Sequence, residues 1–221
     1  MNKNEVTITH NMYKNVTELD VERASHDLFL PVNNEAVYNE TGLENANQLV
    51  SGYKLRSKKN AKTVLEYGCG DGRIARYMAN MCKKLICVDI SQVVLNRAKQ
   101  RLDSFSTANA EFILSDSLED IKAIDFIYCL QVLQHNTFEE QLQIINRIKE
   151  LLKPNGFACI HFPKLENKPQ YVNHDTCMCF TKDQVEHYGK MFSEYEIEER
   201  DLVSGIDDYR VVNDYFLWVK K

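Results

Sequence analysis

One segment constrains the fold of this chain more than any other. Residues 64–72 read Val-Leu-Glu-Tyr-Gly-Cys-Gly-Asp-Gly, so an apolar run enters three alternating glycines, and a helix-like pattern follows. This order is typical of a buried strand, a tight turn and a helix. Glycines in such a turn let the backbone approach a ligand closely, and the N–H groups at the helix start favour an anionic group. The segment therefore predicts a strand-turn-helix unit whose turn binds a ligand.

The chain beyond residue 61 repeats the alternation of short apolar runs with helix-like segments. Strands are predicted over 63–67, 84–89, 110–114, 124–130, 157–162, 195–202 and 215–220, and helices over 73–81, 93–105, 138–152 and 182–190. Apolar strands separated by helices imply a mostly parallel sheet covered on both faces. Only about a dozen residues join the last two strands, so we expect these two to be antiparallel neighbours.

The first 60 residues differ from the rest because they are polar and helical in pattern, with the best helix over 35–53. We interpret residues 1–60 as an N-terminal helical cap on the sheet and residues 61–221 as the main domain.

Composition excludes several classes of protein. The chain has 221 residues and a net charge of −5, and the usual basic stripe of nucleic-acid-binding proteins is missing, so we expect no nucleic-acid partner. No run of ~18 apolar residues predicts a membrane span, and the first residues lack a signal-peptide pattern. We expect a cytoplasmic protein; nothing in the sequence sets an oligomeric state.

The seven cysteines fit a reducing compartment. Cys87, Cys129 and Cys159 lie in apolar strand-like runs, where a free thiol behaves as a small hydrophobe. His174, Cys177 and Cys179 crowd together without a second pair at zinc-like spacing, which leaves a metal site or, more simply, a loop packed over its thiols.

Glu66 followed by Gly68, Gly70 and Gly72 resembles motif I of the class I S-adenosylmethionine (SAM) dependent methyltransferases, and the resemblance extends over about 160 residues. A dinucleotide fingerprint would place its third glycine at position 73, which is Arg73. The resemblance implies a Rossmann-like α/β fold, a seven-stranded mostly parallel sheet with an antiparallel last strand. It also implies SAM as cofactor, S-adenosylhomocysteine as product, and contacts to the cofactor from Glu66, Gly68 and Gly70.

Further positions extend the resemblance along the chain. Asp89 would hold the ribose and Ile90 would pack on the adenine. Asp116 would accept from the adenine amino group, Ser117 would offer its backbone N–H to the ring, and Leu130 would line the cofactor site after the fourth strand. Taken alone, Asp89 also fits a helix cap and Asp116 a surface turn.

The cap contributes a second element, Tyr38-Asn39-Glu40-Thr41-Gly42, which resembles an aromatic-x-x-Ser/Thr-Gly sequence that closes over the methionine end of SAM in small bacterial-type relatives. A helix start capped by Thr41 is the alternative. Arg73 is predicted in the first turn of a helix, where a cation opposes the helix dipole. It is therefore expected either to bind an anion such as the SAM carboxylate or to point outward and pair with Glu66 or Asp71.

His135 follows the fourth strand at the sheet edge where ligands bind, and we predict it to be the base that takes the proton from the acceptor. The alternative is that His135 only lines the wall of the pocket. Relatives of the ubiquinone and RNA-end classes carry E-x-x-E-H here and bind a divalent cation with the glutamates. This chain has Gln131 and Gln134 instead, so we expect no metal.

The acceptor is expected to be a small polar molecule. The D/N-P-P-Y/F and Pro-Cys motifs of nucleic-acid and glutamine methyltransferases are missing, and Gln134 suits a polar acceptor such as a sugar. His161, Tyr171 and His174 are candidate pocket residues of the loop after the fifth strand, with solvent-facing positions as the alternative. A hydroxyl is favoured over an amine.

Two other functions stay open. An aminopropyltransferase has a similar glycine turn but needs acidic residues for its polyamine, and positions 131 and 134 are neutral. A module that binds SAM or a partner without turnover is the other alternative.

Overall fold

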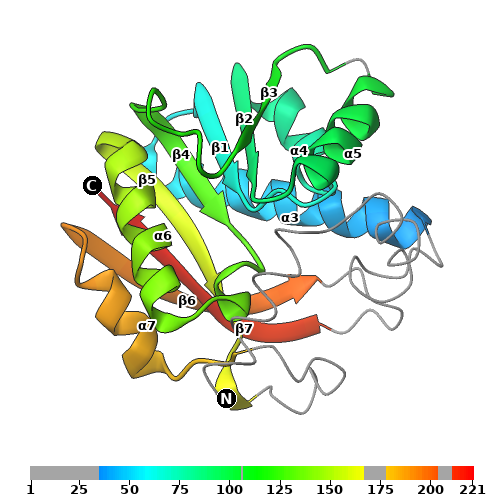
Figure 1. The fold of residues 1–221 in the computed structure, drawn as a ribbon. Coiled ribbons are helices and arrows are strands. Elements are labelled where there is room, and N and C mark those ends of the chain that lie inside the picture. The colour runs from blue at the N-terminus through cyan, green and yellow to red at the C-terminus, as the bar shows by residue number, and fades with distance from the viewer. Residues whose placement is uncertain (1–34, 106, 167–177, 204–210) are drawn as a thin grey trace.

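The computed structural model describes residues 35–105, 107–166, 178–203 and 211–221. Its centre is a seven-stranded sheet with helices on both faces (Figure 1). The strands are β1 (Thr63–Tyr67), β2 (Lys84–Asp89), β3 (Ala110–Leu114), β4 (Ile124–Cys129), β5 (Leu152–Phe162), β6 (Glu194–Val203) and β7 (Val211–Lys220). The predicted strands are confirmed, with β5 and β7 starting several residues earlier than expected.

The sheet has the strand order β3-β2-β1-β4-β5-β7-β6. Strands β1 to β5 pair in parallel, whereas β7 lies antiparallel to both β5 and β6. The expected antiparallel pair at the end of the chain is therefore confirmed, and so is the Rossmann-like class.

Side chains cap the starts of three of the helices, α5, α6 and α7. The long ones are α3 (Glu35–Ser57), α5 (Gln92–Asp103), α6 (Phe138–Leu151) and α7 (Lys182–Gly189). Thr137 and Glu140 form a capping box at the start of α6, and Thr181 caps α7 in the same way. Among the helices that the structure describes, none combines the length and apolar character that a membrane crossing requires.

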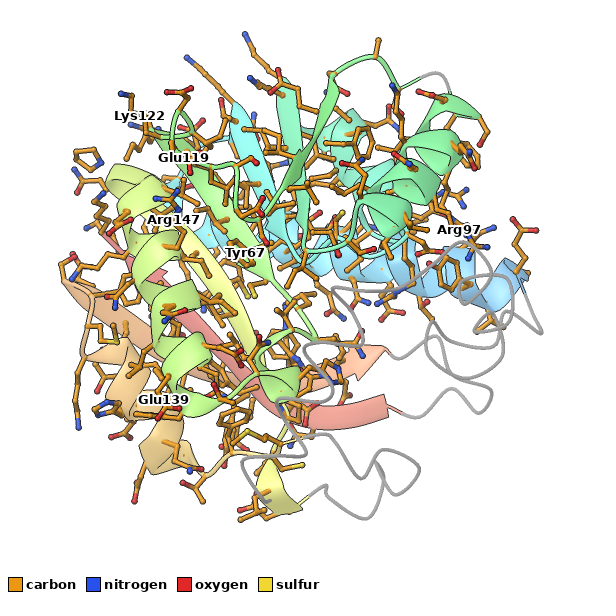
Figure 2. The ribbon with its side chains drawn as sticks, viewed as in Figure 1. Tyr67, Arg97, Glu119, Lys122, Glu139 and Arg147 are labelled. Carbon is orange, nitrogen blue, oxygen red and sulfur yellow. The ribbon has the colours of Figure 1, made fainter. Side chains whose placement is uncertain are left out.

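The core has two halves, one on each face of the sheet. Helices α6 and α7 cover one half, and α3, α5 and the short helix α4 (Ala75–Met78) cover the other. Side chains of β1 alternate between them, so Tyr67 lies on the α6 side, the side where Figure 2 shows Arg147 on α6. Burial raises the pKa of Tyr67 to about 12.

The cap helix α3 packs directly on the sheet. A Cβ at Gly52 would lie 2.3 Å from Cζ2 of Trp218 on β7, so only glycine permits this approach. Trp218 in turn stacks on Phe126 of β4 at 5.8 Å between ring centroids. Helix α3 thus belongs to the same packed body as the sheet, while residues 1–34 of the predicted cap lie outside the described residues.

One helix prediction needs correction. The helix expected from Arg73 begins at Ala75 and gives way to a 3-10 turn over Ala79–Met81. Gly72 has a φ of +86°, which is incompatible with a helix start, so Arg73 belongs to the turn. Cys87, Cys129 and Cys159 are buried free thiols, as predicted.

Candidate functional site

The candidate site lies where the strand order reverses. Strand β1 has β2 on one side and β4 on the other, and ligands of open α/β sheets bind beyond the carboxyl ends of strands at such a point. Tyr67, labelled in Figure 2, ends β1, and the glycine turn follows it.

Each glycine of the turn has a positive φ, but their surroundings differ. A Cβ at Gly68 would lie 2.2 Å from Cγ2 of Val132, and one at Gly72 would lie 2.9 Å from Cδ1 of Leu102. Among the described residues, a Cβ at Gly70 would meet nothing within 4 Å. Gly68 and Gly72 are therefore required by packing, and Gly70 is the member of the turn that faces open space.

Asp89, at the end of β2, holds this turn in place. Its Oδ2 accepts from the Gly70 N–H at 2.9 Å and its Oδ1 from the Ser91 N–H at 3.1 Å. Burial raises the pKa of Asp89, and these hydrogen bonds partly offset the rise. Ser91 caps α5 through its hydroxyl, which accepts from Val94, so the cap alternative for Asp89 is wrong.

The residues expected around the adenine lie past β2 and β3. Ile90 is half-buried, and Asp116 and Ser117 are exposed. The Ser117 N–H donates to the Leu114 carbonyl at 3.0 Å, so the expected free N–H for the adenine ring is not found. The turn after β3 uses that donor internally, which sequence does not reveal.

Glu66 lies in the interior, with 5% of its surface exposed. The Tyr128 hydroxyl donates to its Oε2 at 2.8 Å. Burial raises the pKa of Glu66 from 4.5 to about 8, against the opposing effects of Tyr128 and Arg73. At neutral pH the carboxyl is therefore mostly protonated and adds little negative charge beneath the turn.

Tyr38 fastens the cap helix to the glycine turn. Its hydroxyl donates a hydrogen bond to Asp71, and Asp71 also accepts one from Nη2 of Arg101 at 2.9 Å. Burial and the Asp71 carboxylate raise the pKa of Tyr38 well above its ordinary value. Asp71 and Arg101 were not predicted as partners, because 30 or more residues separate each contact pair along the chain.

Thr41 and Gly42 lie inside α3, so the alternative that Thr41 caps the helix is wrong. The Thr41 hydroxyl instead donates to the Tyr38 carbonyl at 3.0 Å. A Cβ at Gly42 would lie 2.4 Å from the Arg73 carbonyl oxygen. Gly42 therefore allows the cap helix to touch the turn backbone.

Arg73 points inward with 7% of its surface exposed, so the outward pairing with Glu66 or Asp71 is wrong. Its Nη1 donates to Thr41 Oγ1 at 3.2 Å and its Nη2 to Gln131 Oε1 at 3.4 Å. Both acceptors are neutral. Within the described part of the chain this buried cation has no ion pair, and an anionic ligand would suit it.

The segment after β4 brings further residues to this edge. Leu130 is buried, and His135 is half-buried at the end of the 3-10 helix η2 (Leu133–His135). Gln134 is 4% exposed, and its buried Oε1 has no hydrogen-bond partner among the residues that the structure describes. An acceptor oxygen in this state favours a ligand that donates a hydrogen bond.

His161 lies inside the strand predicted over 157–162 and not in the loop after it, so the loop position and the solvent-facing alternative are wrong, while its place in the acceptor pocket stays a prediction. It belongs to β5, is 1% exposed, and places Nε2 at 3.0 Å from Oδ2 of the fully buried Asp214. Asp214 was missed, although a carboxylate in the apolar run of β7 was a usable signal. Tyr171 and His174 lie outside the described residues.

The described ranges contain no group of three His, Cys, Asp or Glu side chains placed to hold a metal ion. Cys177, like His174, is outside those ranges, so the predicted choice between a metal site and a packed loop stays a prediction.

Comparisons with known proteins agree with this geometry. A family model described as a methyltransferase domain matches residues 58–197. An uncharacterized methyltransferase of Oceanobacillus iheyensis is 30% identical over 110 residues, 50% of this chain and 51% of that protein. A ubiquinone biosynthesis O-methyltransferase of Acinetobacter baylyi is 26% identical over 113 residues, 49% of this chain and 46% of that protein. The chain thus spans about half the length of the curated relatives it matches.

Solved structures share the fold over nearly the whole chain. The plantazolicin methyltransferase BpumL in complex with SAH has a TM-score of 0.71 at 14% identity, covering 99% of this chain and 95% of that one. The magnesium protoporphyrin IX methyltransferase of Synechocystis PCC 6803 with bound SAH has a TM-score of 0.67 at 16% identity, covering 97% and 99%. Taken with the matched family model, the motif and the fold, these findings show that the chain belongs to the class I SAM-dependent methyltransferases.

Proposed function

We propose that this chain transfers a methyl group from SAM to a hydroxyl of a small polar molecule. One observation carries the cofactor part. Gly70 faces open space at the switch point, and Asp89 of the neighbouring strand lies 2.9 Å from its N–H. An open backbone surface beside a carboxylate fits a nucleoside, because the carboxylate accepts from ribose hydroxyls.

The remaining cofactor residues are assigned by their position at this edge. Ile90 and Asp116 would contact the adenine, and Leu130 would line the site after β4. The buried Arg73, which has two neutral partners, would bind the carboxylate of the cofactor. Glu66 and Gly68 are assigned to the cofactor site as the motif resemblance implies, while Tyr38 and Gly42 would hold the cap over the methionine end.

The acceptor side is built from the segment after β4. When bound, SAM supplies a methyl group already activated on a sulfonium. The protein then has to align the acceptor and remove its proton. We assign the proton to His135, and we assign to Gln134 Oε1 a hydrogen bond from the acceptor. The ubiquinone O-methyltransferase relatives favour a hydroxyl acceptor, and the neutral Gln134 suits a sugar or a sugar-derived compound.

The net charge of −5 favours a small-molecule partner over nucleic acid. His174 and Tyr171 would complete the acceptor pocket from the loop after β5; His161, buried in β5, has a different part, described below.

A calorimetric titration with S-adenosylhomocysteine tests the cofactor site. Asp89→Asn removes the charge, and Asp103→Asn, at the exposed far end of the helix that follows Asp89, is its matched control. We expect Asp89→Asn to weaken binding at least about tenfold and Asp103→Asn to leave it unchanged. Equal affinities for both variants and the wild type would overturn the assignment.

A further inference from the structure

A series of polar contacts, fully buried at its Asp214 end, runs from β7, the last strand along the chain, to the cap helix. It passes from Asp214 on β7 to His161 on β5 at 3.0 Å, and from His161 Nδ1 to the Gln131 N–H at 3.3 Å. Gln131 Oε1 then accepts from Arg73 at 3.4 Å, and Arg73 donates to Thr41 at 3.2 Å. The chain therefore ends at the guanidinium that we assign to the cofactor carboxylate.

The first link fixes the tautomer of His161. The Gln131 backbone N–H can only donate, so Nδ1 must be the acceptor and Nε2 must carry the proton toward Asp214. The other oxygen of Asp214 accepts from the Lys164 N–H at 2.9 Å, which fixes the carboxylate from its second side. The imidazole also packs on Phe216, with 5.2 Å between ring centroids. The ring has one orientation and one proton position.

The second link fixes an unusual backbone. Gln131 has a φ of +59°, a left-handed conformation that is unfavourable for a residue with a Cβ. Its N–H is satisfied by His161, which is 1% exposed. From this backbone the Gln131 side chain reaches Arg73. His161 therefore acts on the guanidinium through Gln131.

The third link leaves Arg73 with hydrogen-bonding capacity. A guanidinium has five N–H donors, and the described residues engage two of its nitrogens, both with neutral oxygens. A carboxylate needs such a planar group held at a fixed angle in order to bind it with two hydrogen bonds.

We propose that His161 and Asp214 are positioning residues for the amino-acid end of the cofactor, acting through Gln131 on Arg73. This inference rests on the proposed function. It predicts that loss of the Nδ1 acceptor weakens ligands that carry the carboxylate and spares ligands that lack it.

Two variants of His161 isolate that acceptor. In His161→Asn the amide oxygen can take the place of Nδ1, whereas His161→Leu has nearly the same size and no acceptor. Asp214→Asn is a third variant that keeps shape. Its amide cannot accept from both Lys164 and His161, so it disturbs either the fixed carboxylate position or the tautomer.

The experiment titrates S-adenosylhomocysteine and 5′-methylthioadenosine, which lacks the amino-acid end, into the wild type and each variant. In His161→Leu and Asp214→Asn we expect the affinity for S-adenosylhomocysteine to fall about tenfold and the affinity for 5′-methylthioadenosine to fall less than about twofold. His161→Asn should stay within about threefold of the wild type for both.

Equal losses for the two ligands, or equal losses in His161→Asn and His161→Leu, would overturn the inference. If His161→Leu does not fold, as judged by circular dichroism, Asp214→Asn decides by the same comparison. Failure of the wild type to bind S-adenosylhomocysteine would instead overturn the proposed function, so the two failures are distinct.

Discussion

Thr41 Oγ1 lies 3.2 Å from Nη1 of Arg73, and this contact joins the cap helix to the turn that follows β1. The neighbouring Gly42 touches the Arg73 carbonyl, so the two elements meet through both side chain and backbone. The cap helix and the glycine turn therefore form one packed unit, and substitutions in the cap should change ligand affinity at the cofactor site.

Thr41→Val removes the hydroxyl and keeps the side-chain shape. We expect S-adenosylhomocysteine to bind about threefold to tenfold more weakly, because Arg73 loses one neutral acceptor. Thr63→Val, at the start of β1, is the matched control and should bind normally. Titration of both variants checks this, and unchanged affinity in Thr41→Val would separate the cap from the site.

Gly42→Ala should lower the free energy of unfolding by about 1–3 kcal/mol, because the new Cβ meets a backbone oxygen that cannot move freely. The higher helix propensity of alanine offsets only about 1 kcal/mol of this cost. Asn47→Ala, exposed on the same helix, gives the propensity change alone. Urea unfolding measures both, and a stabilised Gly42→Ala would contradict the packing of α3 on the turn.

Glu66→Gln should change how stability depends on pH. The pKa of Glu66 rises from 4.5 to about 8 on folding, so the folded state binds the extra proton between these values, and wild-type stability falls as pH rises through that window. The glutamine variant has no carboxyl to titrate and lacks this loss of stability. Above pH 8 its free energy of unfolding should therefore exceed that of the wild type by a few kcal/mol, on the order of the pKa shift converted to free energy.

Urea unfolding at pH 6 and pH 9 measures the effect. Glu111→Gln, exposed on β3, should follow the wild type. A Glu66→Gln variant whose pH dependence matches the wild type would show that the carboxyl titrates normally.

Gln134→Met should separate stability from function. The buried Oε1 has no hydrogen-bond partner within the described ranges, so replacing the amide with a thioether should leave the free energy of unfolding unchanged or raise it by about 1 kcal/mol. The KM for the methyl acceptor should rise while S-adenosylhomocysteine affinity stays constant. A large loss of stability would instead give Gln134 a structural part.

His135→Gln should lower kcat by about a hundredfold or more, with S-adenosylhomocysteine affinity retained, if His135 takes the acceptor proton. The pH–rate profile should also lose the limb that reports the base. A normal kcat and profile would leave His135 only a place in the pocket wall.

The fold was largely predictable because its strands are short apolar runs and its helices carry capping residues such as Thr137 and Glu140. The placement of Gly70 and Asp89 in one site also followed from the resemblance to the methyltransferase motifs, and the structure brings the two within 2.9 Å. What sequence missed depends on contacts between distant segments. His161 meets Asp214 across 53 residues, and Arg73 meets Thr41 across 32.

Local patterns also misled where a side chain had a choice of partner. The Ser117 N–H donates to the Leu114 carbonyl within the same turn and not to a ligand. The Thr41 hydroxyl donates to the Tyr38 carbonyl inside α3, whereas the alternative from sequence was a helix cap. The helix begins after Arg73 because Gly72 has a positive φ, which the glycine turn imposes. Such outcomes depend on three-dimensional packing that no single window of sequence contains.

The central claim is methyl transfer from SAM to a small molecule. The most direct measurement incubates the protein with methyl-labelled SAM and size-fractionated cell extract, with Asp89→Asn as the inactive control and Asp103→Asn as the active one. The account predicts label in the small-molecule fraction, at least about tenfold less with Asp89→Asn. Label confined to protein or nucleic acid, or no transfer despite tight binding of S-adenosylhomocysteine, would contradict it.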